Sequence, residues 1–119
     1  MNDWKDRFIS EAIEHGQCVE SGEFRQGNAA FGRLVKAVGE LRGHADQGEA
    51  VLTALLAHPN GWVRLGAAKY LLPLRAELAS TVLENLASGP QSHMEFDAKM
   101  VLNEWRAGRL GREADRSAM

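Results

Sequence analysis

Apolar residues recur every three or four positions along most of the chain, which is the spacing that places them on one side of an α-helix. Trp4, Phe8 and Ala12, for example, follow one another at intervals of four residues. No segment keeps the two-residue alternation of a strand, so we expect an all-α protein. The predicted helices run from residue 2 or 3 to about 18, from near 23 or 26 to 43, from 47 to 56, from 62 to 72, from 77 to 87 and from about 93 to 107. Their apolar stripes place Phe31, Val35, Leu78 and Phe96 among the inward-facing residues.

The residues between these segments are of the types that begin and end helices. Asp46 is expected to cap the third helix, with Glu49 three residues later in the reciprocal capping arrangement. The segment 58–61, His-Pro-Asn-Gly, predicts a tight turn, because proline disfavours the helical conformation in the residue before it and Asn-Gly is a strong turn pair. Pro73 and the segment 88–90, Ser-Gly-Pro, interrupt the helical pattern again.

An offset of 30 residues relates the third and fourth predicted helices to the fifth and sixth. Leu56-Ala57 corresponds to Leu86-Ala87, and the segment 68–72 corresponds to 98–102 with alanine, lysine and leucine in the same places. Chance likeness between two amphipathic hairpins is the alternative to a true repeat. Neither unit can bury its apolar side alone. We therefore expect one domain over residues 1–108, built of about six helices as stacked antiparallel hairpins in the manner of an α-solenoid, and a flexible charged tail over residues 109–119.

Composition and charge narrow the function classes. With 119 residues, 45% hydrophobic and 25% charged, the chain is ordinary for one globular domain. A net charge of −2 gives no general attraction to nucleic acid or to an anionic membrane. Cys18 is the only cysteine, which excludes an intramolecular disulfide and suits a reducing compartment. The sequence has no signal peptide pattern and no apolar stretch of membrane-spanning length, so we expect a cytoplasmic protein without a membrane span.

No catalytic or metal-binding constellation is recognisable. Zinc ligands on a helix are spaced by three or four residues; no two histidines are that close, and only His93 has an acid three or four residues after it, Asp97. His58 is expected to serve as a turn residue. Ser10 and Cys18 lack the motifs of nucleophilic catalysis, and Cys18 is expected to be a partly buried thiol. We therefore expect no metal, no cofactor and no catalytic residue. Three glycines are expected to permit close helix packing: Gly27, Gly32 and Gly39.

Two groups of residues are candidates for binding a partner. An acidic face on the first helix is either simply solvated or a contact for a basic protein. Its members are Asp3, Asp6, Glu11 and Glu14. Trp62 is either core or an exposed anchor, since tryptophan and arginine are enriched where binding energy concentrates. Arg64 is either a structural tie or a contact residue.

The segment 54–72, ALLAHPNGWVRLGAAKYLL, resembles a HEAT-type repeat: a leucine-rich helix, a tight turn, then Val-Arg followed by small residues and leucines. In such repeats the residue at Arg64 ties adjacent turns together, but Asn60 stands where an acid is common. Over residues 24–108 the chain also resembles the bacterial family catalogued as domain of unknown function 2019. The resemblance is carried by Asn28-Ala29, by the segments 58–60 and 62–64, by Ala98-Lys99-Met100 and by the segment 104–108, Glu-Trp-Arg-Ala-Gly. It implies a HEAT-like fold without a settled activity, and small helical members found beside toxin genes look like immunity proteins.

These observations favour a non-enzymatic module that presents a rigid helical surface to a protein partner. The concrete version is a bacterial immunity protein that neutralises a toxin or effector. One alternative is a small hydrolase-type enzyme with a carboxylate site in a groove between hairpins. Another is a nucleic-acid-binding HEAT-like domain, which would need six basic residues to converge on one face. They are Arg33, Lys36, Arg42, Arg64, Lys69 and Lys99.

Overall fold

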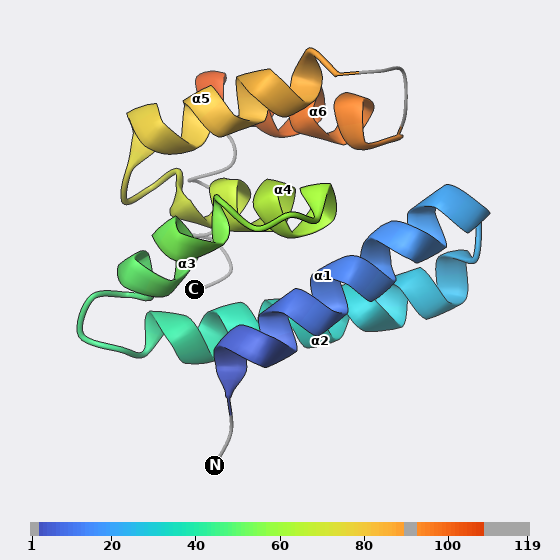
Figure 1. Cartoon of the computed structure of the whole chain (residues 1–119), viewed down its shortest axis with the longest axis horizontal. Coiled ribbons are helices and arrows are strands. Elements are labelled where there is room, and N and C mark those ends of the chain that lie inside the picture. The colour runs from blue at the N-terminus through green and yellow to red at the C-terminus, as the bar shows by residue number, and fades with distance from the viewer. Residues whose placement is uncertain (1–2, 90–92, 109–119) are drawn as a thin grey trace.

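The structure is a computed structural model that describes residues 3–89 and 93–108 (Figure 1). It contains α1 (Trp4–Ser21), α2 (Phe24–Arg42), α3 (Glu49–Leu55), α4 (Gly61–Leu71), α5 (Ala76–Ala87) and α6 (His93–Arg106). No strand occurs in the described residues, so the prediction of six helices and an all-α fold is confirmed. The predicted tail, residues 109–119, lies outside the described residues.

Most helices that follow one another in the chain pack side by side. In Figure 1, α1 lies along α2, α3 lies next to α4, and α5 lies along α6. The α4 helix occupies the centre, where it contacts α1, α3, α5 and α6. Because α4 is surrounded in this way, it is apolar around most of its circumference, and six of its eleven residues are buried.

Local side-chain and backbone chemistry sets the helix ends. The Asp3 carboxylate accepts a hydrogen bond from the backbone N–H of Asp6 at the start of α1. At the end of α1, Gly22 has a φ of 81° and its N–H donates to the Cys18 carbonyl. Glycine adopts this left-handed conformation without the steric cost that a Cβ atom imposes. Asn60 caps α4 by accepting from the backbone N–H groups of Trp62 and Val63.

The start of α3 differs from the prediction. Asp46 does not stand directly before the helix, because Gln47 (φ 57°) and Gly48 (φ 81°) both adopt left-handed conformations and the helix begins at Glu49. The Asp46 carboxylate nevertheless accepts hydrogen bonds from the N–H groups of Gly48 at 2.9 Å and Ala50 at 3.0 Å. These two hydrogen bonds lower the pKa of Asp46. Asp46 therefore caps the first turn from two residues upstream.

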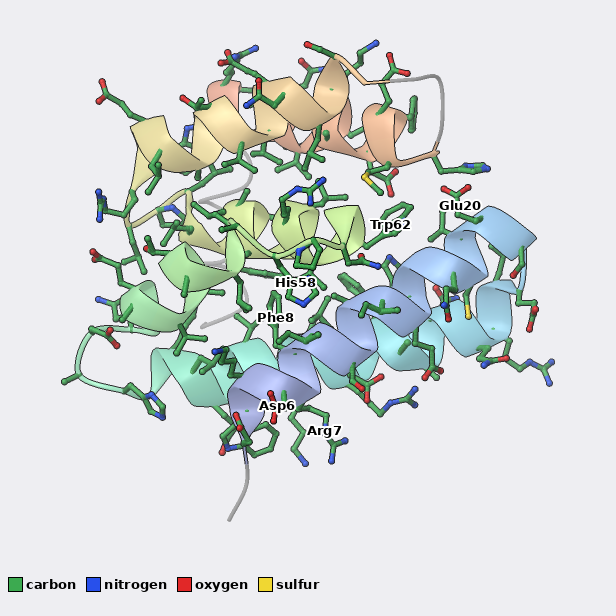
Figure 2. All side chains as sticks on the ribbon, viewed as in Figure 1. Asp6, Arg7, Phe8, Glu20, His58 and Trp62 are labelled. Atoms are coloured by element: carbon green, nitrogen blue, oxygen red, sulfur yellow. The ribbon has the colours of Figure 1, made fainter. Side chains whose placement is uncertain are left out.

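Phe8 and Trp62 fill the space between α1 and α4 (Figure 2). Phe8 is fully buried and Trp62 is 9% exposed. Two glycines make this close approach feasible. A Cβ atom at Gly16 of α1 would overlap the Trp62 indole ring, and a Cβ atom at Gly66 of α4 would lie 3.2 Å from the Phe8 Cζ atom. The two large side chains and the two glycines thus fit together across one helix pair.

Several residues that the apolar stripes placed inward are exposed. Phe31 and Val35 of α2 are not core residues; α2 is buried through a narrower stripe that includes Ala30, Leu34 and Val38. Leu78 of α5 and Phe96 of α6 are likewise exposed, whereas Leu83 and Leu102 are buried. Of the three glycines of α2 expected to permit close packing, only Gly27 does so, since a Cβ atom there would lie 3.0 Å from the Cys18 Cβ atom. Gly32 and Gly39 face open space.

Candidate functional site

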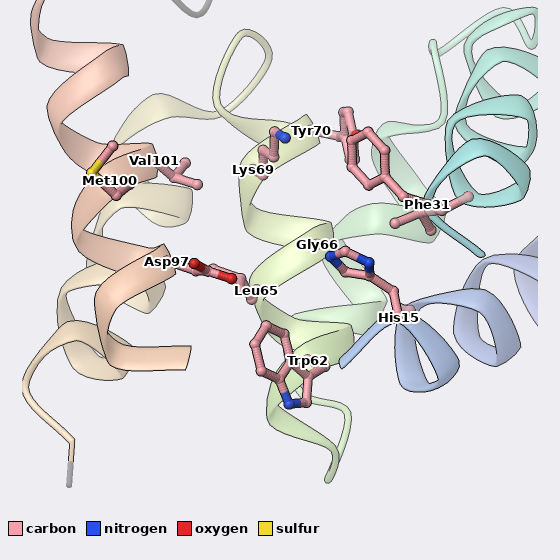
Figure 3. Close-up of a pocket in the computed structure, with 12 residues that line it drawn as sticks. His15, Phe31, Trp62, Leu65, Gly66, Lys69, Tyr70, Asp97, Met100 and Val101 are labelled. Atoms are coloured by element: carbon pink, nitrogen blue, oxygen red, sulfur yellow. The ribbon is translucent and has the colours of Figure 1, made fainter. Parts of the chain in front are cut away.

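A pocket of about 240 Å³ opens where α1, α2, α4 and α6 meet (Figure 3). The α4 helix contributes the largest part of its lining and the other three helices surround it. The lining residues are Ala12 and His15 of α1, Phe31 and Leu34 of α2, Trp62, Leu65, Gly66, Lys69 and Tyr70 of α4, and Asp97, Met100 and Val101 of α6. Most of these side chains are apolar, and among them stand the ionisable groups of His15 on α1, Lys69 and Tyr70 on α4, and Asp97 on α6.

His15 is held in a fixed orientation. Its Nδ1 atom lies 3.2 Å from the carbonyl oxygen of Gly27. A carbonyl oxygen only accepts hydrogen bonds, so Nδ1 carries the proton and Nε2 of the neutral ring is an acceptor. The ring centroid lies 5.4 Å from that of Phe31 and 6.4 Å from that of Trp62, with the indole edge-on to the imidazole. Backbone and aromatic contacts together therefore orient this imidazole at the pocket.

Asp97 lies across the pocket from His15, on α6, and is half-buried (Figure 3). Its carboxylate forms no hydrogen bond or ion pair with any residue that the structure describes. Burial raises the pKa of Asp97, and favourable electrostatic interactions with neighbouring basic groups, including the Lys69 ammonium, offset only part of that effect. Its oxygens are therefore available as acceptors for a ligand that carries N–H or O–H donors.

Lys69 projects from α4 beside two aromatic rings. Its Nζ atom lies 5.3 Å from the ring centroid of Phe31 and 5.3 Å from that of Tyr70, within the range of cation–π attraction. Arg42 also lies near Tyr70, with its guanidinium 5.7 Å from the Tyr70 ring centroid. Burial raises the pKa of the Tyr70 hydroxyl. The ammonium of Lys69 is thus stabilised by aromatic rings on the α2 side of the pocket.

Exposed apolar side chains flank the pocket on two sides. Phe31 and Met100 belong to its lining, and each has an exposed apolar neighbour one helical turn away on the same side of its helix. Together they form what we call the apolar rim: Phe31 and Val35 of α2, and Phe96 and Met100 of α6. The side chain of Phe96 is 62% exposed. Large apolar residues gathered around an open pocket are typical of a binding surface.

The acidic face predicted for α1 is largely neutralised. Glu11 is buried rather than solvated, and Nε of Arg33 donates to its Oε2 atom at 2.9 Å. The same guanidinium donates through Nη2 to Glu14 Oε2 at 3.0 Å. Asp3 caps the helix, and Asp6 lies exposed in its first turn, far along α1 from the pocket (Figure 2). The four acids are therefore not one free negative surface.

The two residues singled out near the turn have different surroundings. Trp62 is a buried core residue that also lines the pocket. Arg64 donates through Nη1 to the carbonyl oxygens of His58 at 2.7 Å and Pro59 at 3.0 Å, which ties the α3–α4 turn to α4. His58 itself accepts from the Asn60 N–H through Nδ1. The structure thus brings Trp62 to the candidate site and holds Arg64 in a contact within the turn.

The pocket residues that sequence reasoning missed are His15, Lys69 and Asp97, together with the exposure of Phe31. They come from four helices far apart in the chain, so no local motif joins them. One signal was available for Asp97: it lies one turn before Val101, on the side of α6 that also carries apolar pocket residues. A polar side chain in such a stripe marks either a core hydrogen bond or a site.

Other chemistries find less support in the described residues. Within residues 3–89 and 93–108, no three histidine, cysteine, aspartate or glutamate side chains come together to hold a metal ion. Cys18 is buried, and this burial raises the pKa of its thiol. Of the six basic residues considered for nucleic-acid binding, Arg33 and Lys99 are held in ion pairs with acids. Among the described helices none is long and apolar enough to cross a membrane.

One solved structure and one family model are similar to this chain. A solved structure described as the crystal structure of the protein RPA1889 from Rhodopseudomonas palustris CGA009 is similar over 89% of this chain and 88% of that chain, with 26% sequence identity and a TM-score of 0.82. No curated protein matches the sequence. The model of one protein family, described as a domain of unknown function (DUF2019), matches residues 3–105. Since that match spans almost all of the described helices, the chain belongs to the DUF2019 family.

Proposed function

We propose that the chain is a non-enzymatic protein-binding module, a short HEAT-like stack of helical hairpins whose pocket receives side chains of a partner protein. The observation that carries the proposal is the apolar rim. Four large apolar side chains stand exposed on the two helices that flank an aromatic pocket, although exposing such groups to water is unfavourable in a free protein. A partner that covers the rim recovers that free energy.

The rim also suggests the form of the partner. Phe31 and Val35 are one turn apart on α2, as are Phe96 and Met100 on α6. A partner segment that lies over the pocket contacts two rows of side chains spaced by a helical turn, which suits an amphipathic helix laid into a groove. Its apolar side chains pack on the rim and a longer one reaches the pocket.

The narrower version of the proposal is a cytoplasmic immunity protein that binds a bacterial toxin or effector. It is supported by the resemblance of small helical members of this kind to immunity proteins. The contact surface proposed is the rim and pocket rather than the acidic face of α1, because Arg33 already engages Glu11 and Glu14. Trp62 contributes to that surface as part of the pocket wall.

The test uses the product of the gene immediately upstream as the partner and two variants matched in exposure. The side chains of Phe31 and Leu78 are both 37% exposed, but only Phe31 belongs to the rim. We expect Phe31→Ser to weaken binding at least about tenfold in a calorimetric titration, and Leu78→Ser to leave the Kd unchanged. Equal effects of the two variants, or no binding of the wild-type chain, contradict the proposal. Thermal melts establish that both variants are folded.

A second candidate is a small hydrolase-type enzyme with a carboxylate site. It is favoured by Asp97, a carboxyl with a raised pKa that faces His15 across a pocket. Such a carboxyl acts as a general acid, and the Nε2 atom of His15 as a general base. Hydrolysis of chromogenic esters, phosphodiesters or glycosides that is lost in Asp97→Asn and unaffected in Asp6→Asn would establish this function. Absence of turnover on these substrate classes leaves the binding proposal in place.

A further inference from the structure

Two hydrogen-bond acceptors face the pocket without a donor. The Nδ1–H group of His15 is directed to the Gly27 carbonyl, so the acceptor nitrogen Nε2 is left for the pocket. Asp97 offers two carboxylate oxygens that no described residue engages. The two groups come from α1 and α6, on opposite sides of the cavity (Figure 3). A ligand that satisfies both must present several N–H donors at once.

The aromatic wall selects among such donors. His15, Phe31 and Trp62 form a cluster, with ring centroids 5.4 and 6.4 Å from the imidazole. A guanidinium group is planar, stacks on aromatic rings, and is less strongly hydrated than an ammonium. It also donates two parallel N–H bonds to one carboxylate, which an ammonium cannot match in geometry. Carboxylate, acceptor imidazole and aromatic rings are therefore the set that fits a guanidinium.

Lys69 places a positive charge at the same pocket as the negative charge of Asp97. Its ammonium is held over the rings of Phe31 and Tyr70, towards α2, while Asp97 stands on α6. A second cation near Asp97 feels repulsion from Lys69, and an anion would feel attraction to Lys69 and repulsion from Asp97. Substitutions of Asp97 and Lys69 therefore change the affinity in opposite directions for a cation and for an anion, which identifies the charge of the ligand.

We infer that the pocket binds the guanidinium of an arginine side chain from the partner protein, between the Asp97 carboxylate and the His15 Nε2 atom. This inference rests on the proposed function in taking the ligand to belong to a protein. The arginine methylenes lie along the apolar lining of Leu65, Met100 and Val101, which is how long basic side chains pack in apolar clefts. Arginine is also among the residues that dominate binding energy at interfaces.

The direct test needs only the purified chain and three small probes. The cationic probe is N-acetyl-arginine N-methylamide, and the matched control is the citrulline analogue, which has the same shape without the charge. N-acetyl-glutamate N-methylamide is the anionic probe. Binding is followed by 15N NMR titration, with the indole N–H of Trp62 as the local reporter. We expect the arginine probe to bind about tenfold or more tightly than the citrulline probe.

Two variants with opposite effects keep the inference falsifiable. Asp97→Asn removes the carboxylate charge and should weaken the arginine probe about tenfold or more, whereas Lys69→Met should strengthen it. Asp6→Asn, at an exposed site on α1, is the matched control and should change nothing. Citrulline binding as well as arginine, or an unchanged affinity in Asp97→Asn, overturns the inference. Tighter binding of the glutamate probe, lost in Lys69→Met, overturns it in favour of an anion.

Lower pH supplies an independent readout. The charged and titratable groups around Asp97 are His15 and Glu20 of α1, Lys69 of α4 and His93 of α6. Acidification protonates the Asp97 carboxylate and removes its negative charge, so the arginine probe should be released as pH falls. If Phe31→Ser abolishes partner binding while Asp97→Asn does not, the proposed function stands and the arginine inference fails. If the arginine probe binds but no protein partner does, the proposed function fails and only a guanidinium-binding pocket remains.

Discussion

Gly16 tests the packing of α1 on α4 more sharply than any other position. It lies inside α1, and a Cβ atom placed on it would overlap the Trp62 indole at Cγ, Cδ1 and Cδ2. These atoms are next to the point where the ring joins its own Cβ, so they cannot swing away as the end of a flexible side chain does. The substitution Gly16→Ala therefore forces either the indole or the whole of α1 to shift.

Two opposing effects set the size of the change in stability. Replacing an interior helical glycine by alanine stabilises a helix by about 1 kcal/mol where space allows. Forcing an extra methyl group into a filled core costs about 1–3 kcal/mol. Because the overlap involves three ring atoms, we expect the cost to lie at the upper end and the net loss to be about 1–2 kcal/mol. For a domain of this size that corresponds to a fall in Tm of roughly 3–8 °C.

The assay is urea denaturation followed by far-ultraviolet circular dichroism. Gly32→Ala is the matched control, since a Cβ atom there meets nothing within 4 Å, and it should stabilise the chain by up to about 1 kcal/mol. In a Trp62→Ala background the overlapping atoms are absent, so Gly16→Ala should change from destabilising to stabilising relative to that background. If Gly16→Ala stabilises the wild-type chain as much as Gly32→Ala does, the close fit of α1 and α4 is wrong.

Three further predictions concern the side chains of Asn60, Asp46 and Asp97. Asn60→Ala removes the acceptor for the N–H groups of Trp62 and Val63 and should cost about 1 kcal/mol in urea denaturation, whereas Asn60→Asp should retain most of the stability. Because the pKa of Asp46 is lowered in the folded chain, its carboxylate stabilises the fold above the ordinary pKa of 3.8, and this stabilisation is lost as pH falls through the lower folded value. Asp46→Asn should therefore flatten the dependence of Tm on acid pH. An unchanged slope contradicts the cap. The raised pKa of Asp97 has the opposite effect on stability: above the folded pKa, the charged carboxylate destabilises the folded chain. Asp97→Asn should therefore raise Tm at neutral pH. This gain should vanish below pH 3.8, where Asp97 is protonated in both the folded and the unfolded chain.

The helices were predictable because their signals are local. Periodic apolar residues and breakers such as Asn60 and Pro73 act within one or two turns, and the observed bounds differ from the predicted ones by only a few residues. The start of α3 was the exception. Its cap depends on left-handed conformations at Gln47 and Gly48, and a non-glycine residue rarely adopts such a conformation, so the sequence pattern favoured a direct cap by Asp46.

The pocket was not predictable because it depends on which helices meet. The stripe of α2 identified Phe31 and Val35 as apolar, but whether a neighbouring helix covers them is a property of the fold and not of α2. Glu11 is the opposite case, a residue predicted to be exposed that the fold buries. It follows the polar pattern of α1, yet Arg33, 22 residues away, reaches it and allows its burial. His15, Lys69 and Asp97 became a group only when three helices were placed around one cavity.

The boundary between the α1–α2 pair and the rest of the molecule crosses the pocket. Apart from the chain connection after α2, that pair is joined to the remaining helices where α1 touches α4 and α6 and where Phe31 and Arg42 of α2 contact side chains of α4. His15 stands on one side of this boundary and Asp97 on the other. A molecule that touches both residues adds a link between these two parts of the fold, so its binding would slow the opening of the whole α1–α2 pair, well beyond the atoms it contacts.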